Sequence, residues 1–186
     1  MPGGPQRGQH EEVAPVPSVR RLNRYQWREY RDLRLRALAD SPDAFTTTLA
    51  QAQARTDTDW SNQVTSGAES PAQIALVAEI GLRLVGLAWG GIDSTDPRRV
   101  YLTQMWVDPG FRGIGVGRKL LGNIIGWARS VNAELVLLSV TSGNSSAKRL
   151  YKNAGFEPVG RSEPLRPGSD LLMQPMRLEL ARRHER

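Results

Sequence analysis

A turn rich in glycine carries the clearest chemical signal in this sequence of 186 residues. Gly113, Gly115 and Gly117 alternate with other residues between a strand-like apolar run and a helix-like segment. Glycine permits positive φ angles and leaves no Cβ to hold a ligand away from the backbone. Backbone N–H groups at the start of a helix attract anions. Because Arg112 and Arg118 flank the turn with positive charge, it is suited to a pyrophosphate.

Two better-known phosphate-binding loops do not fit this segment. A Walker A loop requires Gly-Lys-Ser/Thr, whereas Gly117 is followed by Arg118, Lys119 and Leu120. The dinucleotide fingerprint Gly-x-Gly-x-x-Gly finds no register either, because its third glycine would fall on Arg118 or on Leu120. From the turn alone, a glycine-rich loop that binds no ligand stays an open alternative.

Strands and helices that could position this turn alternate in the second half of the chain. The patterns predict a strand over Val100–Asp108 and a helix over Gly117–Ser130, whose apolar residues follow i, i+1, i+4, i+5 and i+8. A continuous apolar run predicts a strand buried on both faces over Leu135–Val140. A short helix follows over Ser145–Ala154, closed by Gly155.

The first half begins with a possible short strand and a helix. Asn23, with Gln26 three residues on, is a plausible N-cap for a helix that runs to about Leu38. A less regular helical region is expected from Leu49 to Val64, broken near Thr56.

Two β-hairpins complete the prediction of an α+β chain with a mixed sheet. The first pairs Ile74–Glu79 with Leu84–Trp89. The second pairs Phe156–Gly160 with Leu171–Leu180, where Pro175 indicates an edge position or a bulge.

Composition indicates a single globular domain over residues 18–180. Residues 1–17, rich in Pro, Gly and Gln, are expected to form a flexible tail, and residues 181–186 a basic one. No apolar run approaches a membrane span, and the first residues lack a secretory signal, so we expect a cytoplasmic protein. The chain has no cysteine, and its two histidines, His10 and His184, lie near the termini, which argues against a zinc site or a histidine-based triad.

Seven arginines against two acids give residues 20–36 a local charge of +5. Arg24, Arg28 and Arg31 share one helical face by their spacing. A solvated helix face is the favoured interpretation over a docking surface for an anion or a nucleic acid, because no nucleic-acid motif accompanies it. No nucleic-acid or membrane partner is therefore expected.

Several linked motifs resemble those of the GNAT N-acetyltransferase family. Arg112-x-x-Gly115-x-Gly117 is similar to its acyl-CoA signature, and Met105-Trp-Val-Asp-Pro109 to the preceding strand. Leu138-x-Val140, followed by Asn144-x-x-Ala147-x-x-Leu150-Tyr151-x-x-x-Gly155-Phe156, resembles the second motif of the family. Arg36-Ala-Leu38 and Pro42-Asp-Ala-Phe45 extend the resemblance, which covers roughly residues 18–180.

The resemblance implies a central, mixed, mostly antiparallel and twisted sheet of six to seven strands flanked by about four helices. A splayed pair of strands would hold acetyl-CoA, the co-substrate, with no metal. In such a fold the strand residues pair with the pantetheine arm, and the amides of the turn hold the pyrophosphate. The cofactor-binding residues implied are Met105, Trp106, Val107, Arg112, Gly113, Ile114, Gly115, Val116, Gly117, Arg118 and Asn144. Asn144 could instead serve only as a helix N-cap.

The resemblance also implies a reaction, direct transfer of acetyl to a primary amine in a ternary complex. Tyr151 matches the general acid of the family, which protonates the departing CoA thiolate. Helical spacing alone would favour a core aromatic at this position. An acyl-CoA-binding module without transfer activity is the alternative function.

The general base and the acceptor amine stay unassigned. The strand Val100–Val107 has no carboxylate, and Glu79 on the preceding hairpin is the nearest candidate for a base. The acceptor could be a small molecule or a protein, and a homodimer is possible.

Overall fold

The structure, a computed structural model, describes residues 16–181. Residues 1–15 and 182–186, which include both histidines and most of the two expected tails, lie outside the described residues. Pro17, which the sequence assigned to the first tail, is buried, and its carbonyl accepts a hydrogen bond from Lys119 Nζ at 2.6 Å.

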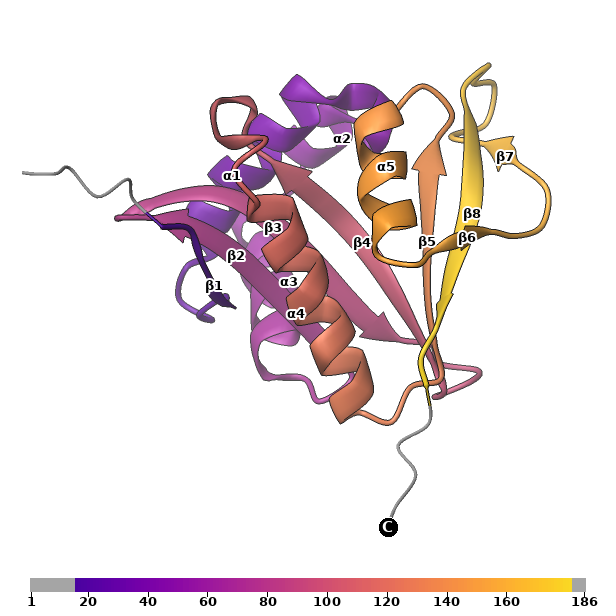
Figure 1. Ribbon diagram of the computed structural model, residues 1–186. Coiled ribbons are helices and arrows are strands. Elements are labelled where there is room, and N and C mark those ends of the chain that lie inside the picture. Colours follow the sequence, from indigo (N-terminus) through magenta and orange to yellow (C-terminus); the bar gives the residue numbers. More distant parts are fainter. Residues whose placement is uncertain (1–15, 182–186) are drawn as a thin grey trace, which may run out of the picture.

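Eight strands form one sheet in the order β1-β2-β3-β4-β5-β8-β6, with β7 also paired to β8 (Figure 1). The strands are β1 (Ser18–Arg21), β2 (Gln73–Ile80), β3 (Arg83–Ile92), β4 (Arg99–Val107), β5 (Leu135–Thr141), β6 (Glu157–Pro158), β7 (Glu163–Pro164) and β8 (Leu172–Glu179). Among the strands of residues 16–181, only β4 and β5 pair in parallel. The predicted α+β fold with a mixed, mostly antiparallel sheet is confirmed, and the two strands of two residues each bring the total above the expected six to seven.

The helices cover the two faces of the sheet unequally. They are α1 (Trp27–Asp40), α2 (Leu49–Gln53), α3 (Asp57–Glu69), α4 (Val116–Ser130) and α5 (Ser145–Asn153), with 3-10 turns η1 (Pro42–Ala44) and η2 (Pro109–Phe111). One hydrophobic core joins α4 and α5 to one face, and a second core joins α1 and α3 to the other (Figure 1).

Strands β4 and β5 pair over only three residues each, Arg99–Tyr101 with Leu135–Leu137, and then diverge (Figure 1). A bulge in β4 accompanies the divergence. Gln104 has a φ of 55°, and the register with β3 shifts between Leu87 and Trp89. A bulge increases local twist and bends its strand. The chain therefore forms the splayed strand pair that the sequence motifs imply.

Two helix starts show where local sequence signals succeeded and failed. The break near Thr56 is confirmed, because Thr56 and Asp59 form a capping box that opens α3. The predicted N-cap at Asn23 is wrong, since α1 begins at Trp27. Asn23 instead accepts a hydrogen bond from the Tyr25 N–H at 2.9 Å, which forms a turn before the helix.

Two expectations for the last strands are corrected by the topology. Pro175 does not lie in an edge strand, because β8 lies between β5 and the short β6 and β7. The Pro175 carbonyl accepts a hydrogen bond from the Val159 N–H and so points away from β5. The Pro175 nitrogen points to the same side, so the missing N–H removes no hydrogen bond between β5 and β8. Strand β5 is not buried on both faces. Leu138 and its alternate neighbours are buried, whereas Ser139 is exposed.

Arginines in the turn before α1 and on its exposed face have partners within the chain. Arg24 forms an ion pair with Glu69 at 2.7 Å, and Arg31 forms one with Asp57 at 3.1 Å. The Arg28 guanidinium lies 4.2 Å from the centre of the Trp27 ring. These contacts agree with a solvated helix face.

A pair of glycine substitutions tests the packing of α3 and α4. A Cβ added at Gly67 would overlap the Trp89 ring, with Cζ3 at 2.6 Å, and would lie 2.8 Å from the Ala75 Cβ, whereas one added at Gly122 meets nothing within 4 Å. We expect Gly67→Ala to lower the free energy of unfolding by about 1–3 kcal/mol through overpacking. Gly122→Ala should raise it by up to about 1 kcal/mol through helix propensity. Thermal unfolding of both variants should show melting temperatures on opposite sides of the parent value, and a Gly67→Ala protein as stable as the parent would contradict this packing.

Candidate active site

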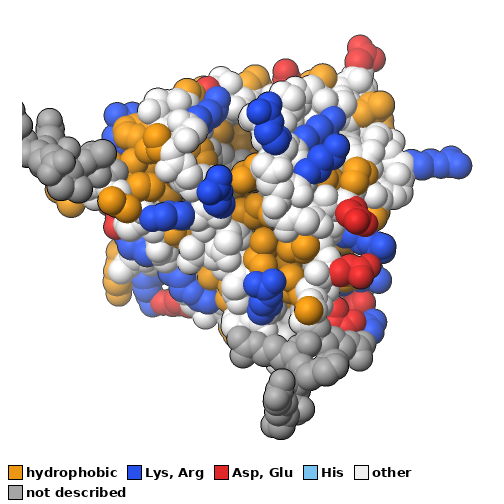
Figure 2. Space-filling model, in the orientation of Figure 1, with side chains coloured by type: hydrophobic (Ala, Val, Ile, Leu, Met, Phe, Trp, Pro, Cys, Tyr) orange, Lys and Arg blue, Asp and Glu red, His pale blue; other side chains and the backbone are white. Residues whose placement is uncertain are grey.

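A cleft of about 680 Å³ opens where β4 and β5 diverge. Its walls come from the end of α1 and η1, the end of β4, the glycine turn, β5 and the start of α5. The space-filling view shows a hollow between α4 and α5 that basic side chains surround (Figure 2). Exposed basic residues on these two helices include Arg118, Lys119, Arg149 and Lys152.

The glycine turn has the backbone geometry that an anion cradle needs. Gly113 and Gly115 adopt left-handed φ angles of 82° and 91°, and a Cβ at either would meet nothing within 4 Å. Gly115 is the N-cap of α4 and has no side chain with which to cap the first turn. Gly117 has a different role, because a Cβ there would lie 3.3 Å from Leu150 of α5. The turn therefore presents free backbone at a helix N-terminus, as binding of a pyrophosphate requires.

Most of the predicted cofactor-binding residues line the cleft, but two side chains do not. Those that line it are Met105, Trp106, Val107, Arg112, Gly113, Gly115, Gly117, Arg118 and Asn144. The Ile114 side chain is 54% exposed outside it, and Val116 is buried in the core beside Gly86. Ile114 and Val116 can contribute only their backbone to a ligand in the cleft.

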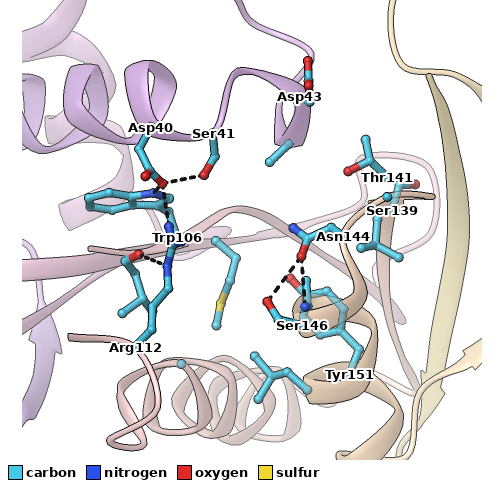
Figure 3. A pocket seen from close by; sticks show the side chains of 18 of the residues that line it. Asp40, Ser41, Asp43, Trp106, Arg112, Ser139, Thr141, Asn144, Ser146 and Tyr151 are labelled. Atoms are coloured by element: carbon cyan, nitrogen blue, oxygen red, sulfur yellow. Dashed lines mark hydrogen bonds and ion pairs between the residues drawn. The ribbon is translucent and has the colours of Figure 1, made fainter. Parts of the chain in front are cut away.

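Asp40 joins the end of α1 to β4 and to the glycine turn (Figure 3). Its Oδ2 accepts hydrogen bonds from Trp106 Nε1 at 2.9 Å, from Ser41 Oγ at 2.6 Å and from Arg112 Nη2 at 2.5 Å. Arg112 Nε also donates to the Val107 carbonyl at 2.9 Å. The sequence motifs did not single out Asp40, because its partners lie 66 and 72 positions away in the chain.

Opposing effects set the charge state of Asp40. Partial burial acts to raise the pKa of its carboxyl, but hydrogen bonds from Ser41, Trp106 and Arg112, with the charge of Arg112, together outweigh burial and lower the pKa. A carboxyl whose pKa is lowered by folding stabilises the fold above its unfolded pKa, about 3.9, and loses that contribution as the pH falls through the folded value.

Asp40→Asn should therefore be less stable than the parent near neutral pH, by on the order of 1 kcal/mol. The difference should narrow as the pH falls below about 4. Asp43→Asn is the matched control, because Asp43 also lines the cleft but forms no ion pair or side-chain hydrogen bond within residues 16–181. Melting temperatures of the three proteins across this pH range measure the effect. If the difference in melting temperature between Asp40→Asn and the parent does not change with pH, the Asp40 carboxylate does not stabilise the fold through its charge.

Asn144 begins α5 and lines the cleft with part of its amide (Figure 3). Its Oδ1 accepts from the Ala147 N–H at 3.1 Å, which is an N-cap bond. Its Nδ2 donates to no group in the described part of the chain. The amide is therefore capped on one side and available to a ligand on the other.

Tyr151 lies on α5 and lines the same cleft. Its ring packs against Phe156, with ring centroids 5.8 Å apart, and the residue is 6% exposed. Burial raises the pKa of the Tyr151 phenol well above its ordinary value of 10.0. Within residues 16–181 its hydroxyl has no hydrogen-bond partner. A neutral phenol of this kind can donate a proton into the cleft.

Glu79, the nearest carboxylate suggested by the sequence, lies outside the cleft lining. It forms an ion pair with Arg20 at 3.0 Å, across the β1–β2 pair. The carboxylates that do line the cleft are Asp40 and Asp43. The described residues hold no cluster of three or more His, Cys, Asp or Glu that could bind a metal, and none of their helices is long and apolar enough to cross a membrane.

The splayed β4–β5 pair, the glycine turn at the start of α4 and Tyr151 in the same cleft are the features that the sequence motifs led us to expect. The sequence profile of the Acetyltransferase (GNAT) family matches residues 23–156. The chain belongs to this family, as its motifs predicted.

Individual relatives are distant. N-alpha-acetyltransferase RimI of Mycobacterium tuberculosis is 35% identical over 92 residues, which cover 49% of this chain and 56% of that protein. A mycothiol acetyltransferase of Beutenbergia cavernae is 28% identical over 153 residues, which cover 79% of this chain and 48% of that protein. The chain thus spans about half the length of these curated relatives.

The fold has solved counterparts. The structure of yncA from Salmonella typhimurium with its cofactor acetyl-CoA superimposes with a TM-score of 0.74 at 20% identity. The match covers 91% of this chain and 97% of yncA. At this identity the likeness concerns the fold alone.

Proposed function

We propose that the chain is an N-acetyltransferase that moves the acetyl group of acetyl-CoA directly to an amine. The observation that carries the proposal is the neutral Tyr151 phenol, which has no hydrogen-bond partner in the described chain and lines the same cleft as the left-handed Gly113 and Gly115. Similarity to two acetyltransferases, RimI and the mycothiol enzyme, supports the proposal. The fold is also that of yncA, whose structure contains acetyl-CoA.

The residues of the cleft fit acetyl-CoA along its length. The backbone of Gly113 to Arg118 would hold the pyrophosphate at the start of α4, with basic side chains of α4 and α5 around it. Beyond Tyr101, β4 has no β5 partner, so backbone groups of Met105 and the N–H of Val107 are available to the pantetheine amides. The Val107 carbonyl already accepts a hydrogen bond from Arg112. The Asn144 Nδ2 is a further donor to that arm.

Acetyl-CoA supplies an acetyl thioester, which is activated toward attack by an amine. As the new N–C bond forms and the C–S bond breaks, Tyr151 donates its proton to the departing sulfur. The amine loses one proton to solvent before attack. Its nitrogen loses a second proton to solvent as the amide forms, and solvent returns a proton to the Tyr151 phenolate. Asp40 and Asp43 are not assigned as bases. The lowered pKa of Asp40 makes its carboxylate a weak proton acceptor, and Asp43 is exposed.

An acyl-CoA-binding module without transfer activity would have the same cradle and no use for the phenol. Release of free thiol from acetyl-CoA in the presence of amines separates the two functions. Amine-dependent release supports an enzyme, whereas binding of acetyl-CoA without release from a broad amine panel supports the module.

A further inference from the structure

A polar cluster lies behind the wall of the cleft that η1 and β4 form. It consists of Tyr30, Arg34, Arg55, Gln63 and Gln104, and Arg34 stacks on Phe45. Phe45 follows Ala44, which lines the cleft, and Gln104 precedes Met105, which also lines it. Consecutive Cα atoms are about 3.8 Å apart. The cluster therefore begins one residue away from the cleft on two separate elements.

Arg34 of α1 is the unusual member of this cluster. The residue is 6% exposed, and its Nη1 is buried without a hydrogen-bond partner. The guanidinium stacks 4.2 Å from the centre of the Phe45 ring and forms no ion pair within residues 16–181. A buried charge without a counter-ion is unfavourable for folding. A bound anion would stabilise the charge of Arg34, and the described chain does not provide one.

The neighbours of Arg34 do not neutralise it. Tyr30 stays uncharged, because burial raises its pKa to about 12 despite the nearby arginines, and its hydroxyl donates to Gln104 Oε1. Arg55 is a second cation, and its Nη1 and Nη2 donate to Gln63 Oε1 and to the Asp59 carbonyl. The Asp59 carboxylate, on which the Arg55 charge acts, is bound to Thr56 at the start of α3.

The cluster lies on the face of the sheet that α1 and α3 cover, opposite the face that α4 covers. Side chains of a strand alternate between faces, so Thr103 of β4 and Ser139 of β5 point away from the core that α4 and α5 cover. Both are exposed, because α1 to α3 do not extend over them. The glycine cradle and α4 lie on the opposite face. A donor held there leaves the α1 side open for the second substrate.

We infer that the acceptor is an amine that also carries a carboxylate, and that Arg34 and Arg55 bind this carboxylate while the amine faces the thioester. The inference rests on the proposed acetyltransferase function and names its substrate class. Guanidinium groups bind carboxylates through paired, charge-assisted hydrogen bonds. Gln104, on the bulge of β4, links this cluster to the cleft wall, because its side chain accepts the Tyr30 hydrogen bond and its chain neighbour Met105 lines the cleft.

A matched acceptor series tests the inference by thiol release from acetyl-CoA. Each set holds an L-amino acid, its primary amide and the corresponding decarboxylated amine, and a peptide arm compares N-terminal Asp or Glu with Asn or Gln. We expect kcat/KM for the carboxylate acceptor to exceed that for its neutral partners by at least about tenfold. A preference in the amino-acid sets would identify the acceptor as a free amino acid, and a preference in the peptide arm would identify it as a peptide.

Variants of the two arginines assign the preference to the cluster. Arg34→Met and Arg55→Met should lower kcat/KM for the carboxylate acceptor by at least about tenfold, mainly through KM, and leave that for its amide within about twofold. Arg34→Lys keeps the charge and should recover part of the preference. Arg24→Met is the control, because Arg24 lies in the turn just before α1 and pairs with Glu69. This variant should leave kcat/KM unchanged for both the carboxylate acceptor and its amide.

Two readouts overturn the inference independently of the proposed function. Preference for neutral amines, or an equal loss for both acceptors in Arg34→Met, would overturn it while leaving the enzyme intact. If Arg34→Met melts at a lower temperature and keeps the preference for the carboxylate acceptor, Arg34 is a structural residue. If it melts at an equal or higher temperature and loses that preference, the inference is supported. Absence of thiol release with every amine, with acetyl-CoA still bound, would instead contradict the acetyltransferase function itself.

Discussion

Replacement of Tyr151 by phenylalanine is expected to lower turnover by about 10²-fold or more and to leave the affinity for acetyl-CoA nearly unchanged. The ring that packs on Phe156 is retained, and only the hydroxyl is lost. That hydroxyl has no hydrogen-bond partner within the described chain, so its removal leaves no protein group unsatisfied. The melting temperature should therefore stay close to that of the parent.

The measurement is thiol release at saturating acetyl-CoA with an accepted amine. Tyr101→Phe serves as the control, because Tyr101 is 42% exposed and lies outside the cleft lining. The deficit of Tyr151→Phe should shrink at low pH if buffer can supply the proton. Equal turnover of Tyr151→Phe and parent, with chemistry shown to limit the rate, would make Tyr151 a core aromatic and remove the general acid.

Gly115→Val is expected to abolish most of the stabilisation that acetyl-CoA gives. A ligand at 100 times its Kd stabilises a protein by about 2.7 kcal/mol, which raises the melting temperature of a chain of this size by several degrees. The φ of 91° at Gly115 is strained for any residue with a Cβ, and most of all for a β-branched one. The added side chain would also occupy the open space in front of the turn.

Backbone strain alone could weaken the protein, so the control must share it. Gly81, in the β2–β3 turn, has a φ of 60° and also meets nothing within 4 Å of an added Cβ, but it does not line the cleft. Gly81→Val should therefore lower the melting temperature and keep the full shift with acetyl-CoA. If Gly115→Val binds acetyl-CoA as tightly as the parent, the pyrophosphate cradle lies elsewhere.

The sequence predicted those parts of the molecule whose signals are local. The strand, glycine turn and helix from Val100 to Ser130 could be predicted because apolar periodicity and glycine spacing act within a few residues. The capping box at Thr56 is local in the same way. Asn23 misled the prediction, because a side chain that can cap a helix can equally close a turn.

The parts of the site that the sequence did not predict depend on contacts between distant segments. Asp40 meets Trp106 and Arg112 only once α1 packs beside β4. Arg34 resembles any other arginine of a basic helix until α1 is placed on the sheet and its side chain is buried behind Phe45. Strand β5 has an apolar sequence, but its exposed side becomes visible only when the helices are assigned to faces.

Transfer of acetyl groups in this cleft can be tested directly by one assay. Parent protein and acetyl-CoA are incubated with a panel of amines with and without a carboxylate, while free thiol and the mass of each amine are followed. We expect thiol release that depends on the amine, with one acetyl group added to the amine for each thiol released. Saturable binding of acetyl-CoA with neither thiol release nor an acetylated product from any amine would contradict it.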